Sequence, residues 1–118
     1  MKTLQEALKT GESIDTEFKS WIKASNMRER ISLAVDELIA FVNCKGGTVY
    51  LGVEDNGEVT GCTGKYDLQS IQEAIYDKTS PHLFTEIEEI EYDGKIVIAI
   101  SVERDGKTYT TADGRCLK

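Results

Sequence analysis

The sequence predicts an α+β domain in which a mixed β-sheet packs against two helices. Two segments, one after Asn26 and one after Asp67, carry apolar residues at helical spacing. The segments 48–53 and 96–102 alternate apolar residues with others, as strands with one buried face do. Two pairs of turn residues, one Asn-Gly and one Asp-Gly, favour hairpins between neighbouring strands. The expected element order is βαββαβββ.

The first part of the chain is expected to hold a short helix, a strand and the longest helix. The short helix lies within residues 2–10, and the strand covers residues 14–19. Asn26 followed by Glu29 is typical of a capping box, with Asn26 as the N-cap. Apolar residues then recur in steps of four, three and four along one helix face: Ile31, Val35, Leu38 and Val42.

Two glycines follow this helix. Lys45 suits the negative end of the helix dipole, and Gly46 suits the left-handed residue that closes a helix. The sequence contains no G-x-x-x-x-G-K-[ST] motif, so a nucleotide cradle at Gly46 and Gly47 has little support. Helix termination is therefore the preferred interpretation of both glycines.

The later elements are marked by turn and cap residues. The Asn-Gly pair at 56–57 predicts a type I′ turn into a short return strand over 58–61. Asp67 is expected to cap a second helix, which ends before the one proline of the chain. The Asp-Gly pair at 93–94 predicts a second hairpin, whose later strand has four apolar residues on one face.

The length of 118 residues suits one domain, 1–118, with a single core. The longest apolar runs are far shorter than a membrane span, and the first residues lack the apolar segment of a signal peptide. Cys44, Cys62 and Cys116 have no C-x-x-C spacing, which predicts reduced thiols in a cytoplasmic protein. Because the sequence stops within a strand-forming region, we expect the N-terminal part of a longer protein.

The net charge of −7 has the wrong sign for a domain that grips nucleic acid by bulk electrostatics. Charge can still be segregated between faces. Acidic residues crowd the segment 86–93, whereas several basic residues lie within the first 65 positions: Lys19, Lys23, Arg28, Arg30, Lys45 and Lys65. A basic face opposed to an acidic one is therefore an open possibility.

Carboxylates are the remaining candidates for chemistry. His82 is the only histidine, so zinc sites rich in histidine and Ser-His-Asp triads lack partners within this chain. Glu12, Glu17 and Asp55 could together offer oxygen ligands suited to Mg²⁺ or Mn²⁺, which would activate water. Their spacing does not bring them together, and a bend between Glu12 and Glu17 would be needed. The alternative is that Glu12 is a surface residue and Asp55 a turn residue.

Two longer motifs resemble the Schlafen-type AlbA-like domain. ESIDTEFK, residues 12–19, resembles the signature E-S-x-x-x-E-F-K of that family. IAFVNCKGGTVYLGVEDNGEVTG, residues 39–61, resembles its central A-F-A-N-x-x-G-G and G-V-x-D-x-G motifs, with Val42 in place of the usual Ala. IQEAIYDKTSPHL and KIVIAISVERDGKTY fit later parts of the family pattern. The closing strand of the family, with an Arg and a Gly-Ser pair, is missing.

The resemblance implies a nucleic-acid-binding domain, DNA-binding or RNA-binding, as found at the N-terminus of transcriptional regulators. Some animal members of the family are endoribonucleases that cut transfer or ribosomal RNA with three carboxylates. By motif position, these acids correspond to Glu12, Glu17 and Asp55 here, which would be both the catalytic residues and the ligands of a Mg or Mn cofactor. The residues do not support the older ATP-binding label of the family.

Three functions follow from these observations. The first is a nucleic-acid-binding domain of a transcriptional regulator, whose phosphate contacts would come from four lysines: Lys19, Lys23, Lys45 and Lys65. The second is a Mg²⁺- or Mn²⁺-dependent endoribonuclease that uses Glu12, Glu17 and Asp55. The third is an interaction module, such as a homodimer, that performs no chemistry. No membrane partner is expected.

Overall fold

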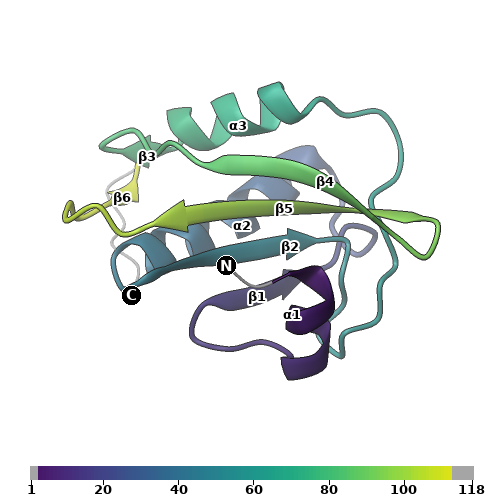
Figure 1. Ribbon diagram of the computed structural model, residues 1–118. Helices are drawn as coiled ribbons and strands as arrows, with labels where there is room; N and C mark the ends of the chain where they lie inside the picture. Colours follow the sequence, from purple (N-terminus) through teal and green to yellow (C-terminus); the bar gives the residue numbers. More distant parts are fainter. Residues whose placement is uncertain (1–2, 113–118) are drawn as a thin grey trace.

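A computed structural model describes residues 3–112 of the chain. Four strands form the main sheet in the order β1-β2-β5-β4, in which β1 and β2 are parallel and the other pairs antiparallel. A second sheet pairs two short strands, β3 and β6. The expected α+β class with a mixed sheet is confirmed (Figure 1). In chain order the elements are α1 (Leu4–Thr10), β1 (Thr16–Lys19), α2 (Met27–Val42), β2 (Gly46–Leu51), α3 (Leu68–Asp77), β3 (Thr79–Ser80), β4 (Glu86–Tyr92), β5 (Lys95–Glu103) and β6 (Thr110–Thr111).

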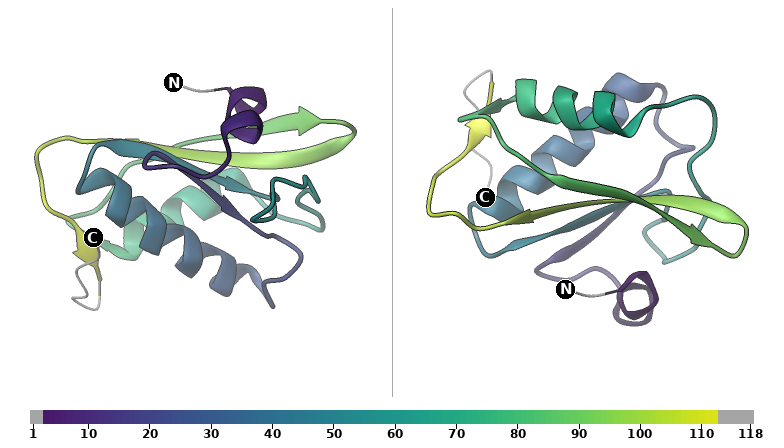
Figure 2. Two further views of the ribbon diagram at one scale, coloured as in Figure 1. Left: turned by 90° about the horizontal axis from the view of Figure 1, so that it is seen from below. Right: turned by 45° about the horizontal axis from the view of Figure 1, so that its top comes forward.

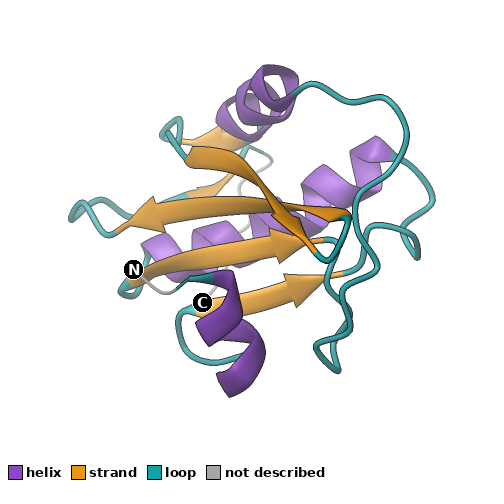
Figure 3. Cartoon of the chain, turned by 45° about the vertical axis from the view of Figure 1, so that its right-hand side comes forward, coloured by secondary structure: helices purple, strands orange, loops and turns teal. Residues whose placement is uncertain are grey.

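The main sheet is covered unequally on its two faces (Figure 2). Helices α2 and α3 pack on one face and bury the larger core, which includes Leu38, Ile75 and Ile98. The short helix α1 lies on the other face, where Leu4 and Ala7 pack near one end of the strands. Figure 3 shows α1 lying over only part of that face. The rest, around the start of β2 and the end of β5, we call the open face.

Several local expectations are confirmed. Asn26 is the N-cap of α2, and its side-chain oxygen accepts a hydrogen bond from the Glu29 N–H at 2.9 Å. Asp67 is the N-cap of α3. Asp93 and Gly94 have φ of 51° and 76°, as a type I′ turn requires, and they join β4 to β5. These capping and turn residues act locally, so they are readable from the sequence.

The interpretation of the two glycines as helix termination is wrong. α2 ends at Val42, and both glycines belong to β2. Gly46 has φ of 87°, and a Cβ there would lie 2.7 Å from the Val102 carbonyl oxygen on β5. A Cβ on Gly47 would lie 2.8 Å from the Phe41 ring. The glycines therefore let β2 approach its neighbours closely, which explains them better than the end of a helix does.

The turn after β2 also differs from its prediction. The Gly57 N–H donates to the Glu54 carbonyl at 2.8 Å, so the central residues are Asp55 and Asn56. Gly57 has φ of 88°, whereas Asn56 lacks the positive φ that a type I′ turn would need. This pattern is a tight turn followed by a left-handed glycine. The expected return strand over 58–61 is reduced to one bridge between Val53 and Val59.

Two further findings concern membrane spans and cysteines. Within residues 3–112, no helix is both long and apolar enough to span a membrane. Cys44 is exposed, Cys62 is buried, and both are free thiols. Cys116 lies outside the described residues.

Candidate functional site

The structure brings together the first two predicted carboxylates. Ser13 and Thr16 exchange backbone hydrogen bonds at 2.9 and 3.3 Å, and this tight turn folds the chain back on itself. Glu12 thereby reaches the outer edge of β1, where its Oε2 accepts a hydrogen bond from the Phe18 N–H at 3.1 Å. The side chain of Glu12 is also hydrogen-bonded to that of Glu17. The bend that the sequence requires for convergence is therefore present.

This carboxyl pair holds a proton. Burial, the hydrogen bond with Glu12 and the nearby charge of Glu37 raise the pKa of Glu17 to about 8, against the lowering effect of Lys19. The Lys19 ammonium lies 3.8 Å from a Glu17 oxygen and 3.5 Å from a Glu37 oxygen. At neutral pH Glu17 is mostly protonated, so its hydroxyl can donate the hydrogen bond that joins it to Glu12.

Asp55 is placed differently from these two acids. It is exposed at the tip of the turn after β2. Within residues 3–112, no three His, Cys, Asp or Glu side chains are grouped so that they could hold one metal ion. The donor set that Mg²⁺ or Mn²⁺ would need therefore does not form among the described residues. The catalytic and metal-binding roles of Glu12, Glu17 and Asp55 stay predictions.

Sequence reasoning missed the neighbour of Asp55. Glu54 is buried, and its Oε2 accepts a hydrogen bond from the Thr60 hydroxyl at 2.6 Å. Its Oε1 lies 3.1 Å from the Lys23 ammonium. Burial opposes ionisation of Glu54, but hydrogen bonds from Thr60 and Ser20, together with Lys23, lower its pKa overall. This carboxylate anchors the segment that follows β2 to the loop after β1.

The four predicted phosphate ligands lie in three different surroundings. Lys19 contacts Glu17 and Glu37, and Lys23 contacts Glu54, so both ammonium groups already have acidic neighbours. Lys23 nevertheless has a side chain that is 76% exposed. Lys45 and Lys65 are exposed, and each lines a hollow of its own. The structure therefore does not bring the four lysines together at one site.

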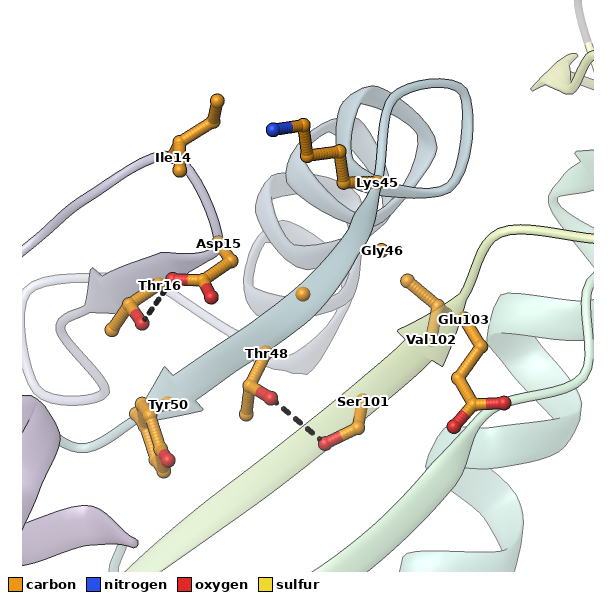
Figure 4. A pocket seen from close by; sticks show the side chains of 11 residues that line it. Ile14, Asp15, Thr16, Lys45, Gly46, Thr48, Tyr50, Ser101, Val102 and Glu103 are labelled. Atoms are coloured by element: carbon orange, nitrogen blue, oxygen red, sulfur yellow. Dashed lines mark hydrogen bonds between the residues drawn. The ribbon is translucent and has the colours of Figure 1, made fainter. Parts of the chain in front are cut away.

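The hollow beside Lys45 lies on the open face and has a volume of about 370 Å³. Figure 4 shows it between the loop before β1, the start of β2 and the end of β5. The Thr48 and Ser101 hydroxyls share a hydrogen bond of 3.0 Å across its floor. The Asp15 carboxylate accepts a hydrogen bond from the Thr16 hydroxyl at 3.2 Å. We call this the Lys45 hollow; its charged groups have both signs.

The hollow beside Lys65 lies between the beginnings of α2 and α3 and has a volume of about 400 Å³. Its lining is mainly apolar and includes Met27, the first residue of α2. Asp67, the N-cap of α3, also lines it, so two helix N-termini meet there. The Tyr66 ring forms one wall and packs edge-on against Trp21, with ring centroids 5.3 Å apart. We call this the Lys65 hollow.

Comparison with known proteins agrees with this architecture. The family model described as Schlafen, AlbA_2 matches residues 12–118, which confirms the resemblance read from the two motifs. No curated protein matches the chain. The DIP2311 protein from Corynebacterium diphtheriae has a similar structure, with a TM-score of 0.77 and 17% sequence identity, over 96% of this chain. The chain spans only 23% of the length of that protein.

A second solved structure covers a domain of similar size. It is the N-terminal domain of a putative ATP-dependent DNA helicase RecG-related protein from Nitrosomonas europaea. Its TM-score is 0.65 at 20% identity, and the similarity covers 95% of this chain and 82% of that one. At sequence identities of 17% and 20%, both similarities show a shared fold.

Proposed function

This chain belongs to the Schlafen AlbA_2 family, and on that premise we propose that it is a nucleic-acid-binding domain of a transcriptional regulator. The observation that carries the proposal is the Lys65 hollow, which combines a mainly apolar lining with an exposed lysine. An unpaired base could pack against Met27 and Tyr66, since bases stack readily on aromatic rings. The adjoining phosphate would then lie near Lys65.

The charges at the Lys65 hollow have both signs. Met27, the first residue of α2, lines this hollow, so the partial positive charge of that helix N-terminus lies beside it. At α3 the Asp67 carboxylate accepts hydrogen bonds from the Gln69 N–H and the Ser70 hydroxyl and offsets the dipole of that helix. The Arg30 guanidinium keeps its charge but is held in place, because its Nε–H donates to the Trp21 carbonyl at 2.8 Å and its guanidinium lies over the Trp21 ring. Lys65 is exposed, and so is most of the Lys23 side chain, so these two lysines are the first candidates for phosphate contacts.

The experiment is a binding titration with labelled single-stranded RNA, single-stranded DNA and duplex DNA, followed by fluorescence anisotropy at two salt concentrations. Replacing Lys23 and Lys65 by Ala should weaken binding and should flatten the salt dependence by about one unit for each phosphate that the protein no longer neutralises. The matched control replaces Lys9 and Lys107, two exposed lysines away from the Lys65 hollow. Equal weakening of binding in the two double variants would mean that only the net charge of the protein matters. Lys23 and Lys65 would then be wrongly assigned as phosphate contacts.

A metal-dependent endoribonuclease is the second candidate, because the structure pairs Glu12 with Glu17 as the family motif would require. A Mg²⁺ or Mn²⁺ ion would supply an activated water and stabilise phosphoryl oxygens. On this alternative, Glu17 must give up its proton and Asp55 must join the pair. The homodimer likewise stays a prediction.

A further inference from the structure

A third hollow lies on the open face where β4 begins. Its volume is about 240 Å³, below the roughly 300–1,000 Å³ of sites that hold small molecules. It is therefore of a size for one side chain of a partner. Residues from the start of β4 and the end of β5 line it: Phe84, Thr85, Glu86, Ser101, Val102 and Glu103. We call it the Phe84 hollow.

The wall of the hollow is an exposed aromatic ring. Phe84 is 77% exposed, the most exposed of the large apolar side chains described. Its orientation is held by Tyr76, whose ring lies edge-on at 5.0 Å between centroids. Tyr76 in turn stacks on His82 at 4.3 Å. The Phe84 ring is therefore held at the surface by its neighbours, where a flat cationic group could lie against it.

The charge around the hollow is negative. Glu86 and Glu103 line it, and both are exposed. Glu88 is two residues along β4 from Glu86 and so lies on the same face of the sheet. Burial, followed by the charges of Glu88, Asp15 and Glu6, raises the pKa of Tyr50 on this face. Lys45 is the opposing cation, but it lines the neighbouring Lys45 hollow and not this one.

We propose that the Phe84 hollow binds an arginine side chain on a basic, extended segment of a partner protein. A guanidinium group can donate to the Glu86 and Glu103 carboxylates while its plane lies against the Phe84 ring. An ammonium group lacks this planar fork, so arginine is favoured over lysine. β4 forms an edge of the main sheet, where an extended partner segment can lie alongside it.

The acidic strand has a simpler explanation, which accounts for only part of these observations. Charged residues on an edge strand prevent unwanted pairing with other chains. That explains why glutamates occur along β4. It does not explain an exposed Phe84 that is held by Tyr76 beside these carboxylates. The proposal is independent of nucleic-acid binding, which involves the opposite side of the sheet at the Lys65 hollow.

The test is an NMR titration of the ¹⁵N-labelled chain with a short peptide of alternating arginine and serine. Matched peptides carry lysine, or uncharged citrulline, in place of arginine. We expect amide shifts concentrated at 84–86 and 101–103 and tightest binding with arginine. Phe84→Ala and Glu103→Gln should each weaken binding roughly threefold to fivefold. Both residues are exposed, so neither change should disturb folding, which the same spectra verify.

Glu91→Gln is the control, because Glu91 is exposed on the same strand but lies on the opposite face from Glu86. It removes the same charge and should leave the affinity nearly unchanged. Equal weakening by Glu91→Gln and Glu103→Gln would overturn the proposal in favour of general attraction to an acidic protein. Equal binding of citrulline and arginine peptides, or shifts at these residues with single-stranded RNA and not with the arginine peptide, would also overturn it.

Discussion

The Lys23 ammonium lies 3.1 Å from a carboxylate oxygen of Glu54, a side chain that is only 8% exposed. Asp55, the next residue, is exposed at a turn. The two acids therefore have different roles. Glu54 holds the segment after β2 against the loop after β1, whereas Asp55 faces the solvent, where it can meet a ligand.

Glu54→Gln should destabilise the fold at neutral pH by about 1–3 kcal/mol, because the amide replaces a buried, hydrogen-bonded carboxylate. Most of this effect comes from the contacts with Thr60 and Ser20, since Lys23 is largely exposed and a solvated ion pair contributes little. The pKa of Glu54 is lowered in the folded state, so its contribution is present above the unfolded pKa and is lost as pH falls through the folded one. Urea unfolding at neutral and acidic pH measures both effects.

Asp55→Asn is the matched control for that experiment, with an expected change within about 0.5 kcal/mol for an exposed residue. A destabilisation as large as that of Glu54→Gln would show that Asp55 has a structural role that its exposure does not suggest.

Glu17 should show the opposite pH dependence. Its pKa in the folded state is about 8, well above the ordinary value of 4.5, because burial and Glu12 disfavour its charge. The neutral Glu17 carboxyl contributes fully to the free energy of unfolding below the pKa of the unfolded state. This contribution is lost as pH rises through about 8. Glu17→Gln, which stays neutral, should therefore be more stable than the natural chain at alkaline pH, with little difference at acidic pH.

Thermal unfolding of both chains across this pH range checks the prediction, and NMR of the Glu17 side-chain carboxyl gives the pKa directly. Glu91→Gln, on exposed β4, serves as the control. A Glu17 titration near the ordinary value would mean that the Glu12–Glu17 hydrogen bond does not form in solution.

The close approach of β2 to β5 predicts a large effect at Gly46. Gly46→Ala places a methyl group 2.7 Å from the Val102 carbonyl oxygen, at a residue with φ of 87°. Gly57 has a similar φ of 88°, but nothing lies within 4 Å of its added Cβ. Gly57→Ala should cost about 1 kcal/mol for the backbone conformation alone, and Gly46→Ala should cost clearly more. Equal destabilisation in urea unfolding would show that the sheet yields at Gly46.

The parts of the fold that the sequence predicted are those fixed by local chemistry. Asn26 caps α2 and the 93–94 pair forms a type I′ turn because each acts through its own neighbours. Gly46 was misread because its partner, Val102, is distant in sequence and adjacent only in the sheet. Glu54 gave no signal, since its burial depends on Thr60 and on the loop that carries Lys23.

The same reasoning explains which parts of the candidate site were predictable. The family motif pointed to Glu12 and Glu17, and the turn between Ser13 and Thr16 does bring them together. Periodicity could not show this, because five residues apart means opposite faces of a strand. The protonated state of Glu17 depends on burial and on the Glu12 hydrogen bond first, and then on Glu37, which α2 supplies from a distant part of the sequence.

Glu17 also decides between the two proposed functions. If the chain is an endoribonuclease, it should cut labelled transfer RNA in the presence of Mn²⁺ or Mg²⁺ and not in EDTA, and Glu17→Gln should abolish the cuts while keeping the fold and RNA affinity. Cleavage should weaken as pH falls, because a metal ligand or base must be ionised and a proton on Glu17 competes with the metal. Glu91→Gln should cut as the natural chain does. Folded protein that binds RNA but does not cut it with either metal would leave Glu12 and Glu17 as a structural pair and favour the binding domain.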